Sequence, residues 1–209
     1  MFNICPGCDE YNVDKIVKAE GEAVFSICPI CQTRQSFRRL PLFLIGGLSA
    51  TGKSTLCREM VKTDLQAMFI DWDCYSPREN FGFELSPKNE SWYMLRFVKN
   101  ISQCGWPCVV FGWFDPEMLS RSGEFRYLSE LHICELICEA GLRADRMAQR
   151  AVWRRPPGDV EEIDSVIDYF LDKKDESPDI LTIDTAQKSI ESSVGILSSW
   201  LRARGVTLT

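Results

Sequence analysis

The segment GLSATGKST, residues 47–55, has the residue types and spacing that bind nucleotide phosphates. It fits the pattern G-x4-G-K-S and lies between an apolar run and an amphipathic stretch, the strand–loop–helix setting that this pattern requires. The two glycines let the backbone curl until its N–H groups face a phosphate, and the following helix directs its positive end at the same point. A lysine in this loop bridges the β- and γ-phosphates, and the hydroxyl after it ligates Mg²⁺. The predicted nucleoside triphosphate site consists of Gly47, Ser49, Ala50, Thr51, Gly52, Lys53, Ser54 and Thr55, with Lys53 catalytic and Ser54 on magnesium.

Two aspartates follow the next apolar run, residues 67–70. Ligands bind at the carboxyl ends of the strands in a parallel sheet, so Asp71 and Asp73 should lie at the same edge as the phosphate-binding loop. Because residues two apart in an extended chain point the same way, we expect both carboxylates to face the site. Asp73 is the predicted catalytic base or substrate ligand, and Asp71 is predicted to hold magnesium. The alternative is that they cap a turn, since aspartate is common at strand ends.

An arginine-rich stretch follows the fourth apolar run of this part of the chain. Arg146 and Arg150 are four residues apart and share one face of a predicted helix, and Arg154 and Arg155 fall in the loop that follows. Guanidinium groups bind phosphates through paired hydrogen bonds and stack on purines. We therefore expect Arg146 and Arg150 to bind ATP, with Arg150 also catalytic. The alternative is a solvated arginine face that pairs with the acids at residues 161–164.

Four cysteines form two C-x-x-C pairs, Cys5 with Cys8 and Cys28 with Cys31, separated by 19 residues. Two such tight turns can direct four thiolates at one point, the ligand set of a closed, structural zinc site. Alternation between the pairs predicts a short hairpin, and the metal would supply much of the folding energy of so small a segment. The alternative, a thioredoxin-like redox pair, needs one C-x-x-C at the start of a helix. Residues 1–40 are therefore predicted to form a zinc ribbon.

The other six cysteines lie in apolar segments and are predicted to be buried thiols: Cys57, Cys74, Cys104, Cys108, Cys134 and Cys138. This usage favours a reducing compartment. The sequence has no apolar run of about 20 residues and begins with an acidic segment, so we expect a soluble cytoplasmic protein. The net charge of −6 argues against a surface that coats nucleic acid, because such a surface needs concentrated positive charge.

Strand and helix patterns alternate along the rest of the chain. The predicted strands are residues 42–46, 67–70, 108–112, 131–138 and 180–184. The predicted helices are residues 54–62, 91–103, 139–151, 159–173 and 187–203. This alternation predicts an α/β fold, with a five-stranded parallel sheet that has helices on both faces.

The chain from about residue 42 to 203 resembles the small P-loop kinases of the nucleoside, shikimate and gluconate kinase type, which are related to adenylate kinase. The resemblance is carried by GLSATGKST, by the D-x-D of Asp71 and Asp73, by RMAQR at 146–150 and by ILTIDTAQKSIESSVGILSSWL at 180–201. It implies that residues 41–209 are a P-loop kinase domain with sheet order 2-3-1-4-5. The zinc ribbon falls outside the core of this family, and the third strand ends in Gly112-Trp113-Phe114 without the usual Walker-B aspartate.

The same resemblance implies roles for individual residues. Arg146 would lie over the adenine and Arg150 would reach the phosphates. Gln187 would border the base, and Arg154 and Arg155 would belong to a lid over the γ-phosphate.

The leading hypothesis is an ATP-dependent kinase that uses Mg²⁺ and transfers the γ-phosphoryl group to a hydroxyl of a small molecule. Aromatic residues after the second and third strands, Trp92 and Trp113 among them, favour a nucleoside-like acceptor, although they suit an ordinary core equally well. One alternative is a 5′-hydroxyl polynucleotide or tRNA kinase whose ribbon binds RNA. Another is a nucleotide-dependent switch whose ribbon binds a protein. The lone histidine, His132, is expected in the core.

Overall fold

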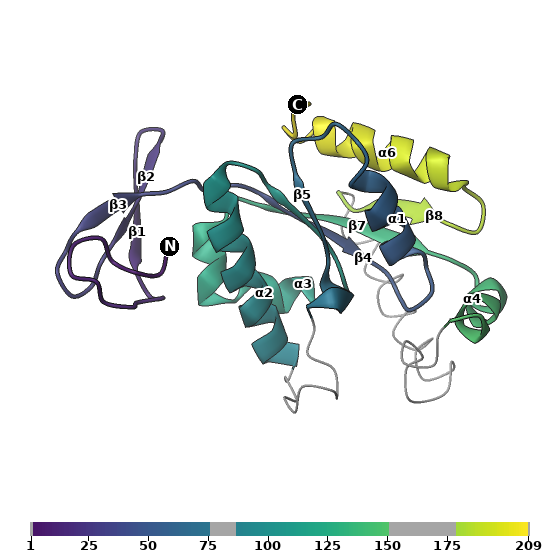
Figure 1. The fold of residues 1–209 in the computed structure, drawn as a ribbon, viewed down its shortest axis with the longest axis horizontal. Helices are drawn as coiled ribbons and strands as arrows, with labels where there is room; N and C mark the ends of the chain where they lie inside the picture. Colours follow the sequence, from purple (N-terminus) through teal and green to yellow (C-terminus); the bar gives the residue numbers. More distant parts are fainter. Residues whose placement is uncertain (1, 76–86, 151–178, 209) are drawn as a thin grey trace. The chain divides into compact units, whose positions relative to one another are not determined.

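The computed structural model describes residues 2–75, 87–150 and 179–208 (Figure 1), and the helix predicted at 159–173 lies outside them. The chain forms two compact units, each built from segments that are separate in the sequence. The ribbon unit comprises Met1–Leu42, Tyr75–Cys108 and Phe114–Leu131. The P-loop unit comprises Phe43–Cys74, Val109–Trp113 and His132–Thr209. Within the described segments, no helix is both long and apolar enough to cross a membrane.

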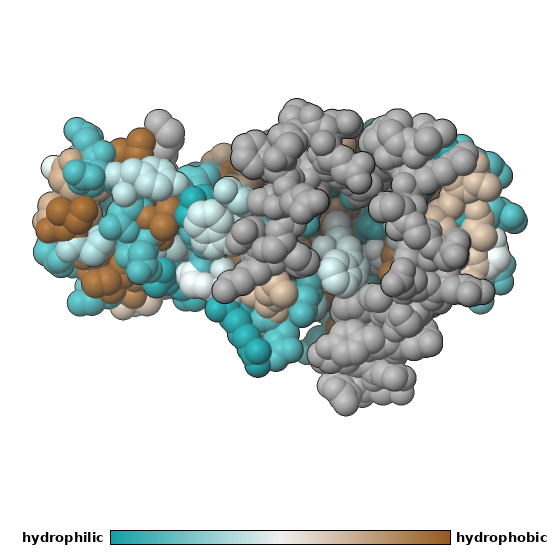
Figure 2. All heavy atoms as spheres, turned by 90° about the horizontal axis from the view of Figure 1, so that it is seen from below, coloured by the Kyte–Doolittle hydropathy of each residue, from teal (hydrophilic) through white to brown (hydrophobic). Residues whose placement is uncertain are grey.

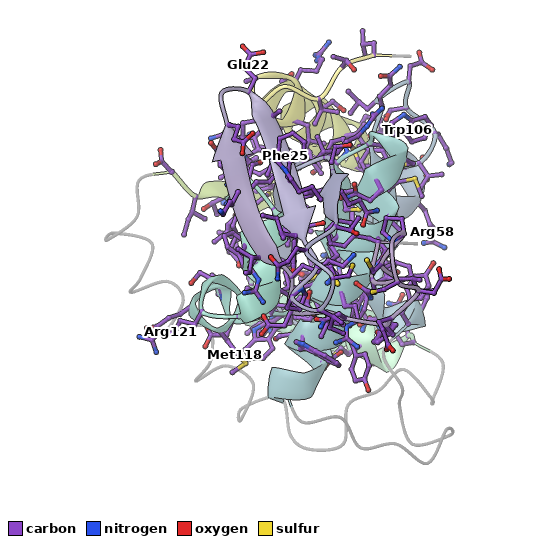
Figure 3. All side chains as sticks on the ribbon, turned by 90° about the vertical axis from the view of Figure 1, so that its left-hand side faces the viewer. Glu22, Phe25, Arg58, Trp106, Met118 and Arg121 are labelled. Carbon is purple, nitrogen blue, oxygen red and sulfur yellow. The ribbon has the colours of Figure 1, made fainter. Side chains whose placement is uncertain are left out.

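The N-terminal part of the ribbon unit is a small antiparallel sheet. Its strands β1 (Ile16–Glu20), β2 (Ala23–Ile27) and β3 (Arg34–Ser36) pair in that order. The hairpin predicted between the two C-x-x-C pairs is therefore confirmed. Gly21 has φ of +61° in the turn, a conformation that glycine adopts at little cost, and Glu22 lies at the end of the hairpin (Figure 3).

The rest of the ribbon unit is helical. Its helices are α2 (Pro87–Ile101) and α3 (Pro116–Ser120), with the 3-10 turns η3 (Ser102–Cys104) and η4 (Gly123–Tyr127). The long helix α2 contacts α3, η3 and η4. Asp115 caps the start of α3, because its side chain accepts hydrogen bonds from the N–H groups of Glu117 and Met118.

Aromatic rings join the ribbon to η4. The ring centroids of Phe2 and Phe37 lie 5.1 and 5.9 Å from that of Tyr127, within the range of favourable ring contacts. The Tyr127 hydroxyl donates to the carbonyl of Val13 (2.8 Å) and accepts from the N–H of Lys15 (2.9 Å). The buried Lys15 ammonium donates in turn to the carbonyl of Phe2 (2.7 Å). Tyr127, from far along the chain, therefore packs against the ribbon and binds its backbone.

An ion pair is buried beside these rings. Lys99 on α2 is fully buried and pairs with Glu124 in η4, which is only 4% exposed. The Lys99 ammonium also lies 4.3 Å from the centroid of the Tyr127 ring. Burial lowers the pKa of Lys99, and the bond to Glu124 opposes that shift. Removing one partner of such a pair typically costs about 3–5 kcal/mol, because the other charge stays buried and unpaired.

The P-loop unit is built on a five-stranded parallel sheet, which confirms the predicted fold class. Its strands are β4 (Leu42–Gly46), β5 (Met68–Asp71), β6 (Cys108–Phe111), β7 (Leu131–Ile137) and β8 (Leu181–Asp184). They pair in the order β5-β6-β4-β7-β8. Numbered within this sheet alone, the order reads 2-3-1-4-5.

Helices α1 (Lys53–Met60) and α6 (Ile190–Arg202) lie side by side against this sheet (Figure 1). Alternate strand residues point to these helices and form the main core, which includes Phe43 and Ile45 of β4. His132 stacks on Phe43 with ring centroids 5.0 Å apart, in the packing role expected of it. A further helix among the described residues of this unit, α4 (Ala140–Ala148), follows β7. The residues that directly follow the carboxyl ends of β4 and β5 are not part of this core and include several of the candidate site residues.

Candidate active site

The loop between β4 and α1 has the curled backbone that the sequence predicted. Gly47, Ala50 and Gly52 have φ of +126°, +67° and +103°. Gly47 and Gly52 adopt their angles readily because glycine has no Cβ, whereas a left-handed angle costs a residue such as Ala50 roughly 1–2 kcal/mol. Gly52 is the N-cap of α1, so the helix begins at Lys53 with its first N–H groups at the loop. The loop therefore presents backbone donors at the positive end of a helix.

Gly47 is also required by the closeness of its neighbours. A Cβ at this position would lie 2.5 Å from the carbonyl oxygen of Leu136 and 2.8 Å from Oγ1 of Thr51. The buried Thr51 hydroxyl donates to the carbonyl of Leu48 (2.8 Å), which closes the loop on itself. The loop is thus packed tightly against β7.

Lys53 reaches back over the loop that precedes it. Its ammonium donates to the carbonyls of Gly47 (2.5 Å) and Leu48 (2.8 Å). Both acceptors are neutral backbone groups, so the charge of the lysine is not cancelled by them. The ammonium is held at the loop where phosphates would bind.

Charged side chains from other elements gather around Lys53. Burial lowers its pKa to about 8, and the fields of Asp73, Glu135 and Asp71 oppose this shift, whereas Arg150 adds to it. The three acids come from β5, η1 and β7, and Arg150 lies just after α4, which ends at Ala148. Three of the predicted site residues, Asp71, Asp73 and Arg150, therefore lie within electrostatic range of Lys53.

The two aspartates do not sit in an extended chain, so that part of the prediction is wrong. Strand β5 ends at Asp71, and the next residues form the 3-10 turn η1 (Trp72–Cys74). The N–H of Asp73 donates to Oδ1 of Asp71 (3.3 Å), so Asp71 caps the turn, as the alternative interpretation held. Within this turn the large side chain of Trp72 is buried. Both carboxylates nevertheless remain in the field of Lys53.

Arg146 on α4 ties three segments together. Its guanidinium donates to the carbonyl and hydroxyl oxygens of Thr185 (3.0 and 3.2 Å), to the carbonyl of Ala50 (3.4 Å) and to Sγ of Cys138 (3.4 Å). The Thr185 hydroxyl donates in turn to the carbonyl of Thr51 (2.8 Å). Arg146 therefore holds the phosphate-binding loop against the end of β8. Its place over adenine stays a prediction.

The other predicted residues are only partly located by this structure. Gln187 is exposed in the turn after β8, next to Thr185. Ser54 lies in the first turn of α1, beside Lys53, and Thr55 is exposed on the same turn. Arg154 and Arg155, predicted to form the lid, lie outside the described residues.

The four ribbon cysteines form one cluster, as predicted. All four Sγ atoms lie within 4.8 Å of one another, with Cys5 and Cys31 3.5 Å apart and Cys8 and Cys28 3.9 Å apart. A zinc ion with Zn–S bonds of about 2.3 Å spaces tetrahedral sulfurs about 3.8 Å apart. The donor set and its spacing therefore fit one tetrahedral zinc ion.

Matching turns present these sulfurs. Asp9 and Gln32, each directly after the second cysteine of a pair, have φ of +57° and +62°. Their N–H groups donate to the carbonyls of Cys5 and Cys28, both at 3.0 Å. Each turn folds back on its first cysteine in the same way, which is how two short segments direct their thiols at one point.

Two of the remaining cysteines are exposed, contrary to the prediction that all six are buried. They are Cys74 and Cys104. Each is the last residue of a 3-10 turn that ends a strand or helix, η1 and η3, so it lies beyond the apolar run that suggested burial.

Comparison with solved protein structures identifies the fold. No family model and no curated protein sequence matches the chain. A thymidylate kinase from Candida albicans superimposes with a TM-score of 0.53 at 16% identity, over 81% of this chain and 98% of its own. A gluconokinase from Sinorhizobium meliloti gives 0.52 at 20% identity, over 80% and 99%. A deoxyadenosine kinase from M. mycoides gives 0.50 at 16%, over 79% and 100%. The chain has the P-loop kinase fold.

One residue of the candidate site was missed in the sequence. Glu135 on β7 is half-buried, and desolvation raises its pKa to about 7 against the opposing field of Lys53. A Cβ on Gly46 would lie 2.2 Å from Oε1 of Glu135, so this carboxylate occupies the space beside the start of the loop. The available signal was a single acid within the apolar strand LHICELI. An acid in the middle of an apolar strand is uncommon unless it has a partner or a function.

Replacing Arg146 should loosen the P-loop and weaken nucleotide binding. Because the guanidinium donates to both Thr185 and Ala50, we expect Arg146→Ala to raise the dissociation constant of ADP about tenfold or more, which corresponds to losing one or two charge-assisted hydrogen bonds. Arg146→Lys should recover little, because an ammonium cannot span both acceptors. Calorimetric titration with ADP measures this, with the exposed Arg202→Ala as the control. An unchanged ADP affinity in Arg146→Ala would contradict this role.

Proposed function

We propose that this protein is an ATP-dependent kinase that transfers the γ-phosphoryl group to a hydroxyl of a small molecule. The observation that carries the proposal is the curled loop at the start of α1, which holds the Lys53 ammonium on its carbonyls with Asp71, Asp73 and Arg150 in electrostatic range. The fold shared with solved kinases supports it, because phosphoryl transfer in that fold depends on such a loop and its lysine.

Each residue has a task in this proposal. The loop N–H groups and Lys53 hold the β- and γ-phosphates, and Arg150 stabilises the charge that develops on the transferred group. Asp73 accepts the proton of the acceptor hydroxyl as its oxygen forms the new bond to the γ-phosphorus. The bond from that phosphorus to the bridging oxygen breaks, and ADP leaves with the electron pair.

Magnesium fits the donor set at this site. The hydroxyl of Ser54 and the carboxylate of Asp71 are oxygen ligands of the kind that Mg²⁺ prefers, and both belong to the elements that border the loop. When bound, the ion neutralises charge on the β- and γ-phosphate oxygens. We assign Ser54 and Asp71 to hold it.

We favour a nucleoside-like acceptor on the aromatic side chains that follow β5 and β6 in the sequence, and one of them, Trp92, lines a cavity within the ribbon unit. It has a volume of about 700 Å³, and its lining includes Trp92 and Ser91 of α2, Met118 of α3, and Arg121, the residue directly after α3. Met118 and Arg121 are labelled in Figure 3. The guanidinium of Arg96 already lies over the Trp92 ring at 3.4 Å from its centroid. An indole beside hydroxyl and charged groups suits a planar ring that carries hydroxyls.

The proposal is tested by ADP release from ATP with pooled acceptors. The pools are nucleosides, nucleoside monophosphates, small polyols and 5′-hydroxyl oligonucleotides. Stimulation by nucleosides is the expected result, and stimulation by oligonucleotides alone would favour the polynucleotide kinase instead. ADP release that no pool stimulates, with nucleotide-dependent capture of a protein, would contradict the kinase and favour the switch.

We also propose that the cysteine cluster binds one structural zinc ion. Purified protein should contain about one zinc per chain, and Cys28→Ser should lose it, because three thiolates no longer close the tetrahedron. Metal analysis of both proteins measures this, with the exposed Cys104→Ser as a control that should keep its zinc. Fully folded wild-type protein without metal would contradict the assignment.

The outer surface of the ribbon is not strongly basic. Residues 1–40 contain five basic and five acidic residues, and apolar patches lie among hydrophilic ones on this part of the molecule (Figure 2). Ile16 and Ile30 are exposed there. RNA binding relies on concentrated positive charge, so this surface favours the small-molecule kinase over the polynucleotide kinase.

A further inference from the structure

We infer that Glu135 is a positioning residue for the P-loop lysine: its carboxylate is seated against Gly46, the neighbour of Gly47 whose carbonyl accepts from the Lys53 ammonium, and its charge orients that ammonium from the β7 side of the loop. The inference rests on the proposed kinase function and adds a residue to it.

Gly46 is the first observation in support. It ends β4 and precedes the phosphate-binding motif, and its backbone is not in the left-handed region that requires glycine at Gly47 and Gly52. A glycine in a strand lowers stability unless something approaches closely. What approaches is Glu135, whose Oε1, Oε2 and Cδ would lie 2.2–2.6 Å from a Cβ at this position. The glycine makes room for the carboxylate.

The sheet order is the second observation. Strand β4 lies between β6 and β7, and β5 is on the far side of β6. Asp71 and Asp73 therefore act on Lys53 from one side of the loop, and Glu135 acts from the other. In the proposed reaction the two aspartates are engaged by magnesium and by the acceptor hydroxyl. Glu135 is then the acid that stays with Lys53 throughout.

The strand that usually supplies an acid to this site does not do so here. Strand β6 ends at Phe111 and is followed by Gly112, Trp113 and Phe114. Glu135 enters from the other neighbour of β4 instead. The site thus has three acids around Lys53, with the third on a strand where apolar residues would pack as well.

This position gives Glu135 two opposite effects on ATP. Its negative charge repels the phosphates, which weakens ground-state binding, and it attracts Lys53, which fixes the ammonium for the transition state. Removing the charge while keeping the shape should therefore lower kcat and, at the same time, leave ATP binding unchanged or tighter. A residue that merely supports the fold would lower stability and weaken ATP binding together.

The test compares Glu135→Gln with the exposed Glu139→Gln as a matched control. We expect Glu135→Gln to lower kcat about tenfold, with KM for ATP and the calorimetric dissociation constant of ATP equal to or below those of the wild type. That fold-change corresponds to about 1.4 kcal/mol of transition-state stabilisation. Its melting temperature should fall little, because the amide keeps the shape of the side chain and Lys53 keeps its hydrogen bonds to the carbonyls of Gly47 and Leu48.

A mutant cycle tests the link to Gly46. Gly46→Ala should displace the carboxylate and reproduce the loss of kcat, and Glu135→Ala should do the same by removing it. The double variant should lose little more than either single one, because both changes remove one interaction. Additive losses in the double variant would overturn the inference, as would a wild-type kcat in Glu135→Gln or a loss confined to KM and stability.

These outcomes are separable from failure of the proposed function. If the wild type releases no ADP with any acceptor, the kinase proposal fails, but ATP binding to Glu135→Gln still reports on this residue. Weaker ATP binding than the wild type would then contradict the positioning role. If the wild type is active and Glu135→Gln has the same kcat and ATP affinity, the kinase proposal is retained and only this inference is rejected.

Discussion

Lys53→Ala should reduce acceptor-dependent ADP release by about 10³-fold, the loss expected when a preorganised group that stabilises transition-state charge is removed. Lys53 is the cation held at the loop by the carbonyls of Gly47 and Leu48, and the surrounding acids keep it charged. The measurement is the turnover number with the acceptor that the pooled assay identifies.

The matched control is Lys62→Ala. Lys62 follows the same helix, is exposed and pairs with Glu59 at the surface, so its removal should change turnover little. Turnover retained in Lys53→Ala would remove the P-loop from the mechanism.

A pH profile of the wild type reports on the same lysine. Because its pKa in the free protein is about 8, the ammonium is present below that pH and is lost above it. The ratio kcat/KM for ATP, which reports the free enzyme, should therefore fall as the pH rises through about 8. In kcat the fall should move to higher pH, because bound phosphates stabilise the ammonium.

Asp73→Asn should lower kcat by about 10²–10⁴-fold, the usual range for loss of a general base, with ATP affinity unchanged or slightly higher. Asp73 sits in the turn after β5 within the field of Lys53, and the proposed function assigns it the proton of the acceptor hydroxyl. Asparagine keeps the shape of the side chain but cannot take up the proton of the hydroxyl.

The comparison is with Asp64→Asn, an exposed aspartate shortly before β5. Single-turnover rates separate chemistry from product release, and calorimetry gives the ATP dissociation constant. If Asp73→Asn turns over like Asp64→Asn, another group must accept the proton.

The phosphate-binding loop was predictable because its requirements are local. Positive φ at Gly47 and Gly52 and the helix start at Lys53 all follow from a short segment of sequence. The cysteine cluster was predictable for the same reason, since each C-x-x-C turn folds on itself and only the meeting of two turns is long-range.

What the sequence did not predict depends on neighbours in space. The turn after Asp71 buries Trp72, which no strand pattern reveals. Glu135 belongs to the site only because β7 lies next to β4, and because the residue opposite it is glycine. Arg146 was found by its spacing, but its bonds to Thr185 and Ala50 depend on where β8 ends.

The ribbon packs against Tyr127, whose hydroxyl accepts from the N–H of Lys15 across 112 residues of sequence. During synthesis the four cysteines can collect their metal as soon as Cys31 has emerged, because their turns are local. Phe2 and Lys15 then lack their contacts with Tyr127 until β4, β5, β6 and finally η4 have been synthesised. The ribbon is therefore among the first parts of the chain to fold and among the last to make all of its contacts. During synthesis, a bound metal ion would stabilise the folded ribbon until Tyr127 is available to pack against it.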